Sequence, residues 1–317
     1  MTLAVLLAAL SVAFPKPGIR LPPVTECYMI GATDSGATNV VVAGVSYPVY
    51  RTGAWAAMAA VTGGVNVVTV TDGTNRVDWM VEVERPRPAP KSAPGVKPPP
   101  SKPKVYEKLA YAKDEARPSP VGKAPGDVTI WLDPGHGGAK DLGAVSPHGW
   151  DEKEANLLLA LEVRRALEEC GFRVEMTRTN DVAVQLFERA RPAHAGKADA
   201  FVSIHHNAPA ANRPAGEIRF SSVYAWNPLG DALAKAVAAR MRAKVEHANF
   251  AVTRSPEIPS CLVEADFVTH PVGEESVWNA ANRRMKARQI ADGILDWCNH
   301  SPSDPSAGLQ VRNPTSK

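Results

Sequence analysis

The chain has 317 residues, of which 44% are hydrophobic and 22% charged, and its formal net charge is +3 at pH 7. These proportions are ordinary for globular proteins and exclude a chain that is disordered throughout. No apolar run reaches the roughly 18 residues that cross a bilayer, so we expect no integral membrane segment. Four scattered cysteines without a CxxC pair exclude a disulfide scaffold. The length fits one enzyme-sized domain with an accessory domain.

An apolar run near the start of the chain allows two interpretations of residues 1–19. Residues 3–13 are too few to span a membrane, but they suit a signal-peptide core with a small-residue cleavage site ending at Ala13. We therefore expect an exported protein, located in the periplasm, the cell envelope or the medium. The alternative is a buried first strand or helix, and the lack of Lys or Arg ahead of the run supports it.

Residues 20–85 are expected to form a small all-β accessory domain, an immunoglobulin-like sandwich. Residues 65–70 are rich in β-branched side chains, residues 76–84 alternate in polarity, and Asp72-Gly73 provides a turn between them. Trp55 and Trp79 could line a sugar-binding face, but aromatic side chains in a small sandwich belong more often to its core. No histidine occurs in this segment, so we expect no catalytic centre in it.

Residues 86–125 form a basic, Pro-rich linker. From Arg85 to Lys123 the chain holds ten basic residues, three acidic residues and ten prolines. Because proline donates no backbone hydrogen bond, we expect an extended, semi-rigid spacer. We interpret its charge as that of a solvated linker; contact with an anionic polymer such as cell wall or nucleic acid is the alternative. We expect no nucleic-acid partner.

Residues 126–300 alternate between strand and helix patterns, which predicts an α/β domain with a mostly parallel or mixed sheet flanked by helices. A helix that begins near Glu152 should end at Gly171, a residue type favoured just after helices. Residues 301–317 are polar and are expected to be a disordered tail. The expected strands are 128–132, 172–176, 200–204, 215–220 and 261–263, and the other expected helices are 186–190, ended by Pro192, 229–245 and 279–298.

Four polar residues stand at the ends of these apolar elements. His136 lies in a glycine-rich turn after the first strand, His205 and Glu264 end later strands, and Glu152 lies in the first helical turn. Open α/β sheets place their sites at the carboxyl edge of the strands, so these side chains can converge. Two imidazoles and a carboxylate are typical ligands of catalytic zinc, and a further carboxylate can serve as base. The sequence therefore predicts a hydrolytic zinc site.

Four motifs in this domain resemble those of the zinc-dependent N-acetylmuramoyl-L-alanine amidases of the Amidase 3 type. They are DPGHGG (133–138), GWDEKEANL (149–157), SIHHN (203–207) and LVEADF (262–267), in the family's order across about 170 residues. The resemblance implies that His136, Glu152 and His205 bind Zn²⁺ and that Glu264 is the catalytic glutamate. Among nearby carboxylates, Asp151 and Glu154 do not align with the family's motif.

Other residues in and near the motifs are candidates for supporting roles. Asp133 and Asn207 are candidates for orienting the metal ligands. His206 occupies a position where the family usually has a small residue, and it either contacts substrate or points away from the site. His270 also departs from the family pattern, and His148, His194, His247 and His300 are expected to be exposed. Cys170 and Cys298 lie at expected helix ends, so a disulfide between them is an open question.

The resemblance implies hydrolysis of the amide bond between N-acetylmuramic acid and the L-alanine of the peptidoglycan stem peptide. Peptidoglycan is then the substrate, and the oligomeric state is open. Some family members insert an inhibitory helix between the motifs that carry His205 and Glu264, but this interval is too short for one here. We therefore expect an open site. The alternatives are another zinc peptidase or carboxypeptidase acting on wall peptides, and a catalytically silent wall-binding protein.

Overall fold

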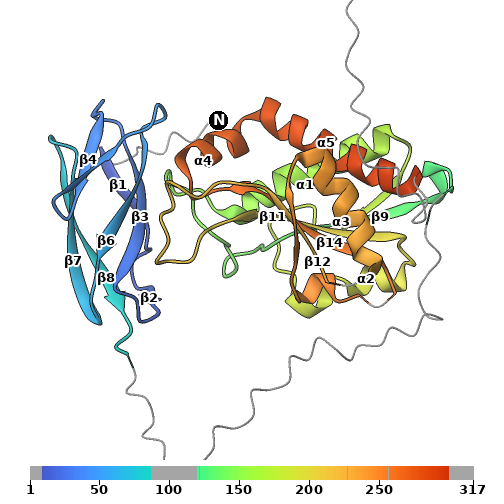
Figure 1. The fold of residues 1–317 in the computed structure, drawn as a ribbon, viewed down its shortest axis with the longest axis horizontal. Coiled ribbons are helices and arrows are strands. Elements are labelled where there is room, and N and C mark those ends of the chain that lie inside the picture. The colour runs from blue at the N-terminus through green and yellow to red at the C-terminus, as the bar shows by residue number, and fades with distance from the viewer. Residues whose placement is uncertain (1–8, 87–119, 121, 227, 256, 300–317) are drawn as a thin grey trace, which may run out of the picture.

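The computed structural model describes residues 9–86, 120, 122–226, 228–255 and 257–299. An all-β domain with strands between residues 10 and 83 lies beside an α/β domain that starts at residue 125 (Figure 1). The first eight residues, most of the expected spacer and the expected tail fall outside the described residues. The expected fold class, an α/β domain preceded by an all-β region, therefore agrees with the structure.

The β domain consists of two sheets packed face to face, in the orders β1-β3-β6 and β2-β8-β7-β4-β5. All strand pairs are antiparallel except that of β2 with β8. Met29, Trp55 and Val70 are fully buried between the sheets, and each such side chain stabilises the fold by about 1.5–3 kcal/mol. Trp55 thus belongs to the core, and Trp79 packs against that core while donating its indole N–H to the Pro15 carbonyl. The strands are β1 (Leu10–Phe14), β2 (Arg20–Leu21), β3 (Glu26–Thr33), β4 (Asn39–Val42), β5 (Val45–Pro48), β6 (Ala54–Ala60), β7 (Gly64–Thr71) and β8 (Arg76–Val83).

Strand β1 changes the interpretation of the first residues of the chain. It pairs with β3, and its Leu10 and Val12 side chains are buried in the sandwich core. Residues 10–14 thus form a buried first strand, as in the alternative interpretation, and cleavage after Ala13 would cut it. The first strand of the sandwich therefore begins at Leu10.

The α/β domain is built on one six-stranded sheet of order β10-β9-β11-β14-β12-β13. The first four strands run parallel to one another, β12 is antiparallel to β14, and β13 is parallel to β12. The strands are β9 (Thr129–Pro134), β10 (Arg173–Met176), β11 (Ala200–Asn207), β12 (Ser222–Ala225), β13 (Lys244–His247) and β14 (Ser260–Phe267). The helices are η2 (Pro125–Asp127), α1 (Glu152–Glu169), η3 (Leu186–Glu188), α2 (Arg191–Ala195), α3 (Pro228–Met241), η4 (Ala251–Thr253), α4 (Pro271–Trp278) and α5 (Ala280–Asn299).

Helices α1, α3 and α5 cover one face of this sheet (Figure 1). Their apolar side chains, such as Leu159, Val237 and Ile290, are fully buried against Ile130 and other strand residues. Helices α3 and α5 pack closely because residue 293 is glycine: a Cβ there would lie 2.5 Å from the Val237 Cα. A smaller cluster with η4 and α2 covers the other face. The layers hold the strand ends in fixed positions.

Three expected elements differ from the structure. The expected 229–245 helix ends at Met241 because Arg242 has a φ of 54°, and the chain then forms β13. Residues 215–220 form no strand; Ala215 is instead buried against the β domain, and the strand follows at β12. Pro192 lies in the first turn of α2 rather than ending a helix, since the first helical turn needs no N–H there.

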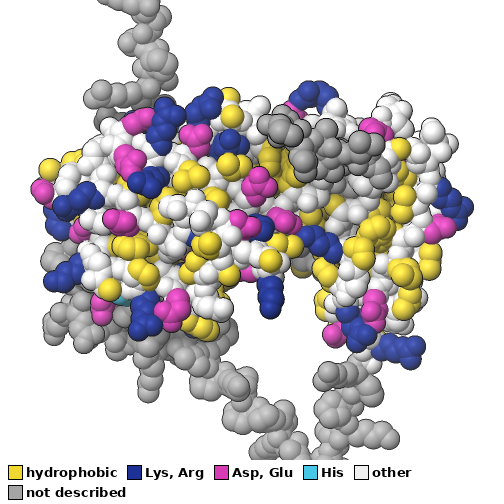
Figure 2. Space-filling view, turned by 180° about the vertical axis from the view of Figure 1, so that it is seen from behind, with side chains coloured by type: hydrophobic (Ala, Val, Ile, Leu, Met, Phe, Trp, Pro, Cys, Tyr) yellow, Lys and Arg dark blue, Asp and Glu magenta, His cyan; other side chains and the backbone are white. Residues whose placement is uncertain are grey.

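Neither sign of charge predominates on the face shown in Figure 2. Lys and Arg side chains are interspersed there with Asp and Glu over both domains. Among the described residues, no helix combines the length and the hydropathy that a bilayer span requires.

Candidate metal centre

The first site residue, His136, lies in the turn that follows β9. Its φ of 60° is rare for a residue with a side chain, and such strain clusters at functional sites. Glycine is required beside it: a Cβ on Gly135 would lie 2.1 Å from the His205 ring. The Arg189 guanidinium stabilises the turn by donating to the His136 carbonyl at 3.0 Å. The backbone thus presents the His136 imidazole at the carboxyl edge of the sheet.

Glu152 is the first residue of α1 and is only 4% exposed. The two neighbouring acids do not share its position. Asp151 precedes the helix and pairs with Lys16 of the β domain, and Glu154 is exposed. Glu152 is therefore the acid of this segment that the structure brings to the two histidines.

His136, Glu152 and His205 each offer one ligand atom, and these atoms all lie within 4.8 Å of one another. The His136 Nε2 is 3.4 Å from Glu152 Oε2, and the His205 Nδ1 is 3.1 Å from Glu152 Oε1. Two imidazole nitrogens facing one buried carboxylate form a donor set that suits a single Zn²⁺ ion. Among the described residues, no other group of three His, Cys, Asp or Glu side chains could hold a metal ion.

Hydrogen bonds orient these three side chains. The His136 Nδ1–H donates to Asp141 Oδ1 at 2.5 Å, which leaves Nε2 facing Glu152. Asn156, one helical turn after Glu152, donates to Glu152 Oε1 at 3.0 Å, and the Ala144 N–H donates to Oε2 at 2.9 Å. Asp141 and Asn156 were missed from the sequence, although the i, i+4 spacing of Glu152 and Asn156 on one helix face could have indicated the latter.

The charges of the site are strongly coupled. Burial alone would raise the pKa of Glu152, but hydrogen bonds from His136 and His205 hold it well below its ordinary value. Burial would also lower the pKa of His136, and the Glu152 and Asp141 carboxylates instead raise it to about 9. The carboxylate is therefore ionised, and the site attracts positive charge between the two rings.

Glu264 lies on β14 directly beside His205 of β11, its register partner. Its Oε2 is buried and has no hydrogen-bond partner. Burial raises the pKa of Glu264 to about 7, in part offset by the neighbouring His205. A buried, unpaired carboxyl oxygen that can gain or lose a proton near neutral pH has the properties of a general base.

The other candidate residues lie around the site rather than in it. Asp133 is fully buried and is held by Arg189 at 2.9 Å, so it supports the His136 turn without contacting a histidine ring. His206 is buried and donates Nδ1–H to Asn156 Oδ1 at 2.8 Å; it points away from the solvent and steadies the residue that holds Glu152. The Asn207 side chain accepts from the Ala208 N–H.

The other described histidines outside the motifs do not belong to the cluster. His148 was expected to be exposed, but it is largely buried and bonded to Glu274 of α4. His270 caps the N-terminus of α4. His194 is partly buried, His247 is exposed, and His300 lies outside the described residues. All four cysteines are free, so Cys170 and Cys298 form no disulfide.

Comparison with known proteins decides the family of this domain. Residues 130–296, just over half of the chain, match the family described as N-acetylmuramoyl-L-alanine amidase (Amidase_3). The chain belongs to this amidase family. The site described above lies wholly within the amidase domain. The β domain lies outside the match.

Individual relatives support the same assignment. The chain is 33% identical over 225 residues to the N-acetylmuramoyl-L-alanine amidase AmiC of Neisseria meningitidis, covering 54% of this chain and 53% of that protein. It is 29% identical over 249 residues to AmiA of Escherichia coli, covering 59% of this chain and 84% of that protein. The chain thus spans about half the length of the first relative. The solved structure of the amidase AmiC2 of Nostoc punctiforme is 33% identical, with a TM-score of 0.50, and covers 54% of this chain and 96% of that one. The amidase domain therefore has the family's fold.

Proposed function

We propose that this protein is a zinc-dependent peptidoglycan amidase that cleaves the bond between N-acetylmuramic acid and the L-alanine of the stem peptide. The single observation that carries the proposal is the convergence of His136, Glu152 and His205 within 4.8 Å, with the unpaired Glu264 carboxyl beside them. Membership of the amidase family supplies the substrate class.

Zinc fits the residues that are present. Two imidazole nitrogens and one carboxylate are the ligands of many catalytic zinc sites, in which a further position is left for water or substrate. The buried Glu152 carboxylate between two rings supplies charge compensation. The hydrogen bonds from His136 to Asp141 and from Asn156 to Glu152 provide the orientation that ligands of this kind require. No cysteine belongs to the cluster, which argues against a thiolate site.

Zinc, when bound, lowers the pKa of water and polarises an amide carbonyl. Glu264 then acts as general base: its carboxylate takes a proton from the attacking water as the new C–O bond forms. As the C–N bond breaks, Glu264 returns the proton to the departing amine of L-alanine. Its raised pKa, about 7, suits both directions of this transfer at neutral pH.

The partial exposure of the two histidines supports a centre that is open to substrate. The side chains of His136 and His205 are 26% and 18% exposed. Between His205 and Glu264, the described residues form β12, α3, β13 and η4, and none of these is an added inhibitory helix. Since the substrate is a wall polymer, we propose that the protein acts outside the cytoplasm, in the periplasm, the cell envelope or the medium.

The test is a Glu264→Gln variant of the full chain, assayed for zinc content and for muropeptide release. We expect wild-type zinc content and a turnover reduced by about 10²–10⁴-fold, the usual contribution of a general base. Glu154→Gln, an exposed change in the same domain, is the matched control and should keep full activity. A Glu264→Gln enzyme that digests wall at the wild-type rate would overturn the assignment of the base.

Mass spectrometry of the products separates the alternatives. Intact stem peptides with a free L-alanine amine identify an amidase. Released terminal amino acids would instead identify a carboxypeptidase that uses the same metal geometry. Zinc binding without release of any product would identify a catalytically silent wall-binding protein.

A further inference from the structure

The β domain contacts the α/β domain at three segments near the metal centre (Figure 1). These are the 139–151 loop, the 208–218 segment and helix α4, which follow His136, His205 and Glu264 along the chain. The contacts include the ion pairs Lys16–Asp151 (3.0 Å) and Arg51–Glu275, the hydrogen bond from the Tyr28 N–H to the Ala211 carbonyl (2.7 Å), and the packing of Ala56 against Ala215. The β domain therefore rests on the segments that extend from the site residues.

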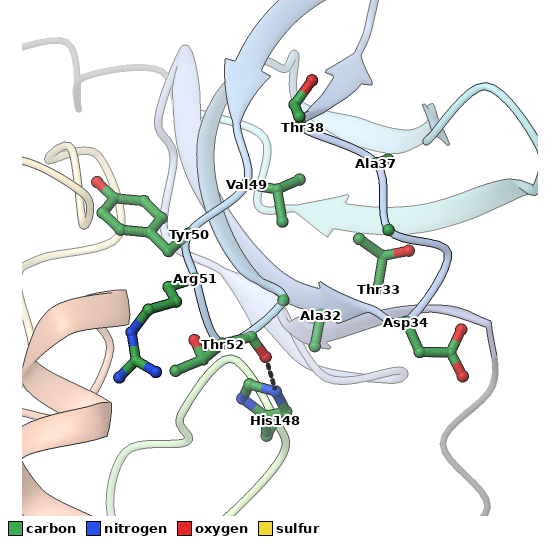
Figure 3. A pocket seen from close by; sticks show the side chains of 12 residues that line it. Ala32, Thr33, Asp34, Ala37, Thr38, Val49, Tyr50, Arg51, Thr52 and His148 are labelled. Carbon is green, nitrogen blue, oxygen red and sulfur yellow. Dashed lines mark hydrogen bonds between the residues drawn. The ribbon is translucent and has the colours of Figure 1, made fainter.

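His148 stands at the centre of this interface. It belongs to the 139–151 loop, and its Nε2 lies 3.2 Å from the Thr52 carbonyl oxygen of the β domain (Figure 3). Its Nδ1 lies 2.8 Å from Glu274 Oε2, and its backbone N–H donates to Glu274 Oε1 at 2.8 Å. One side chain thus joins the loop, helix α4 and the β domain.

Both partners of the His148 ring are acceptors, which determines its protonation state. A neutral imidazole carries one N–H, so it can donate to the carboxylate or to the carbonyl but not to both. Both hydrogen bonds require the imidazolium form. Trp150 stacks on the ring at 5.4 Å, an arrangement that favours a cation.

The other charged groups near His148 are paired with partners of their own or, in the case of Asp34, line the adjoining cavity. On α4, Glu274 is the partner of His148 and Glu275 pairs with Arg51. On the loop, Asp151 pairs with Lys16. Asp34 of the β domain lines the same cavity of about 480 Å³ as His148, and this cavity gives the ring access to solvent (Figure 3).

The loop that His148 holds also reaches into the metal centre. It connects His136 to Glu152 and carries Asp141, which orients His136, and Ala144, whose N–H donates to Glu152. Bridges between Gly137 and Asp141 and between Val145 and Asp151 make the loop a compact unit. His148 therefore shares one compact loop with the groups that position His136 and Glu152.

We propose that the protonated His148 is a positioning residue that docks the β domain on the 139–151 loop and so keeps the metal centre in its binding geometry. The accessory domain is then part of the catalytic apparatus rather than only a means of placement. The consequences for activity and for zinc affinity rest on the proposed function, but the docking itself does not.

The docking depends on pH with a defined sign. The hydrogen bond to Glu274 raises the pKa of His148, with burial opposing it. The docking contribution is thus fully present below the ordinary histidine pKa of about 6.5 and is lost as the pH rises through the higher value of the docked state. Undocking is expected on the alkaline side of neutrality.

The test compares full-length variants by zinc titration against a chelator and by hydrogen–deuterium exchange corrected for intrinsic rates, between pH 6 and pH 9. His148→Gln supplies one neutral donor, so it should weaken zinc binding about tenfold at pH 6 and increase exchange in residues 139–151. The wild type should approach the exchange of this variant as the pH rises. His247→Gln, which changes an exposed histidine on β13, is the control and should match the wild type at each pH.

A second variant separates docking from effects inside the amidase domain. Ala56→Glu places a charge where Ala56 meets Ala215, without touching His148, and should undock the β domain. Loss of protection at the Tyr28 amide, which donates across the interface, reports undocking. We expect zinc affinity and loop exchange to change as in His148→Gln.

Two results would overturn the proposal. One is wild-type zinc affinity and loop exchange in His148→Gln across the pH range. The other is an undocked Ala56→Glu protein with an unchanged loop and unchanged zinc affinity. If the chain proved not to cleave muropeptides, the proposed function would fail while both of these measurements still decided the docking.

Discussion

Gly135 offers a direct test of the metal centre because its missing side chain makes room for a ligand. A Cβ at this position would lie 2.1 Å from both Cε1 and Nε2 of the His205 ring. Gly135 does not have a positive φ, so alanine brings no backbone strain of its own. We therefore expect Gly135→Ala to act through the position of His205.

The size of the effect follows from the geometry. Ordinary van der Waals contact begins at about 3.4 Å, so the ring must move by roughly 1.3 Å or the turn must move away. Metal–ligand distances tolerate only about 0.2 Å, so a shift of this size removes His205 as a productive ligand. Changes that merely disturb the orientation of a ligand cost about 10–100-fold in metal affinity, and we expect at least about 100-fold here.

The assay is zinc titration of the metal-free variant against a chromophoric chelator, with urea denaturation of the same metal-free protein. Gly126→Ala is the control, because a Cβ there meets nothing closer than 3.9 Å. The free energy of unfolding of Gly135→Ala should be about 1–3 kcal/mol lower than that of the wild type, the usual cost of overpacking. Wild-type zinc affinity in Gly135→Ala would refute the placement of His205 at the metal.

Two further predictions concern buried charges. Burial would raise the pKa of Asp72, but hydrogen bonds from Thr33 and Asn75 hold it below its ordinary value, so the stabilisation is present above about pH 4 and lost below it. Asp72→Asn should lower the free energy of unfolding by about 1–3 kcal/mol at pH 7, measured by urea denaturation. The difference in stability between wild type and variant should be smaller at pH 3, and an unchanged difference would contradict this. Arg189→Met leaves the Asp133 carboxylate buried without its cation. It should therefore lower the free energy of unfolding by about 3–5 kcal/mol. Adding Asp133→Asn should recover part of that loss, and a single variant of wild-type stability would show that the pair is dispensable.

The parts of the fold that the sequence predicted are those with local signals. Gly171 ends α1 with a φ of 90°, as expected from its residue type. His136, His205 and Glu264 each follow an apolar run, and parallel strands bring such ends to one edge. Local pattern and site position agree there, so the motifs sufficed to locate the candidate site.

The parts that were mispredicted depend on contacts between distant residues. The apolar start of the chain is compatible with a signal peptide, and only pairing of β1 with β3 makes it a strand. Residues 215–220 have a strand-like pattern, but Ala215 packs against the β domain instead. Asp141 and His148 lie in a loop without periodicity, so nothing in the pattern predicted their bonds to His136 and Glu274.

Glu152 explains why the docking of another domain can matter to this site. Its carboxylate is contacted from β11 by His205, from its own helix by Asn156, and from the 139–151 loop by the Ala144 N–H. The first two contacts lie within the rigid layers of the domain, whereas the third depends on where the loop stands. Because that donor is a backbone group, only proline at this position would remove it, and proline would also constrain the loop backbone. Moving the loop through its contacts with the β domain is therefore the way to test whether the geometry of Glu152 depends on it.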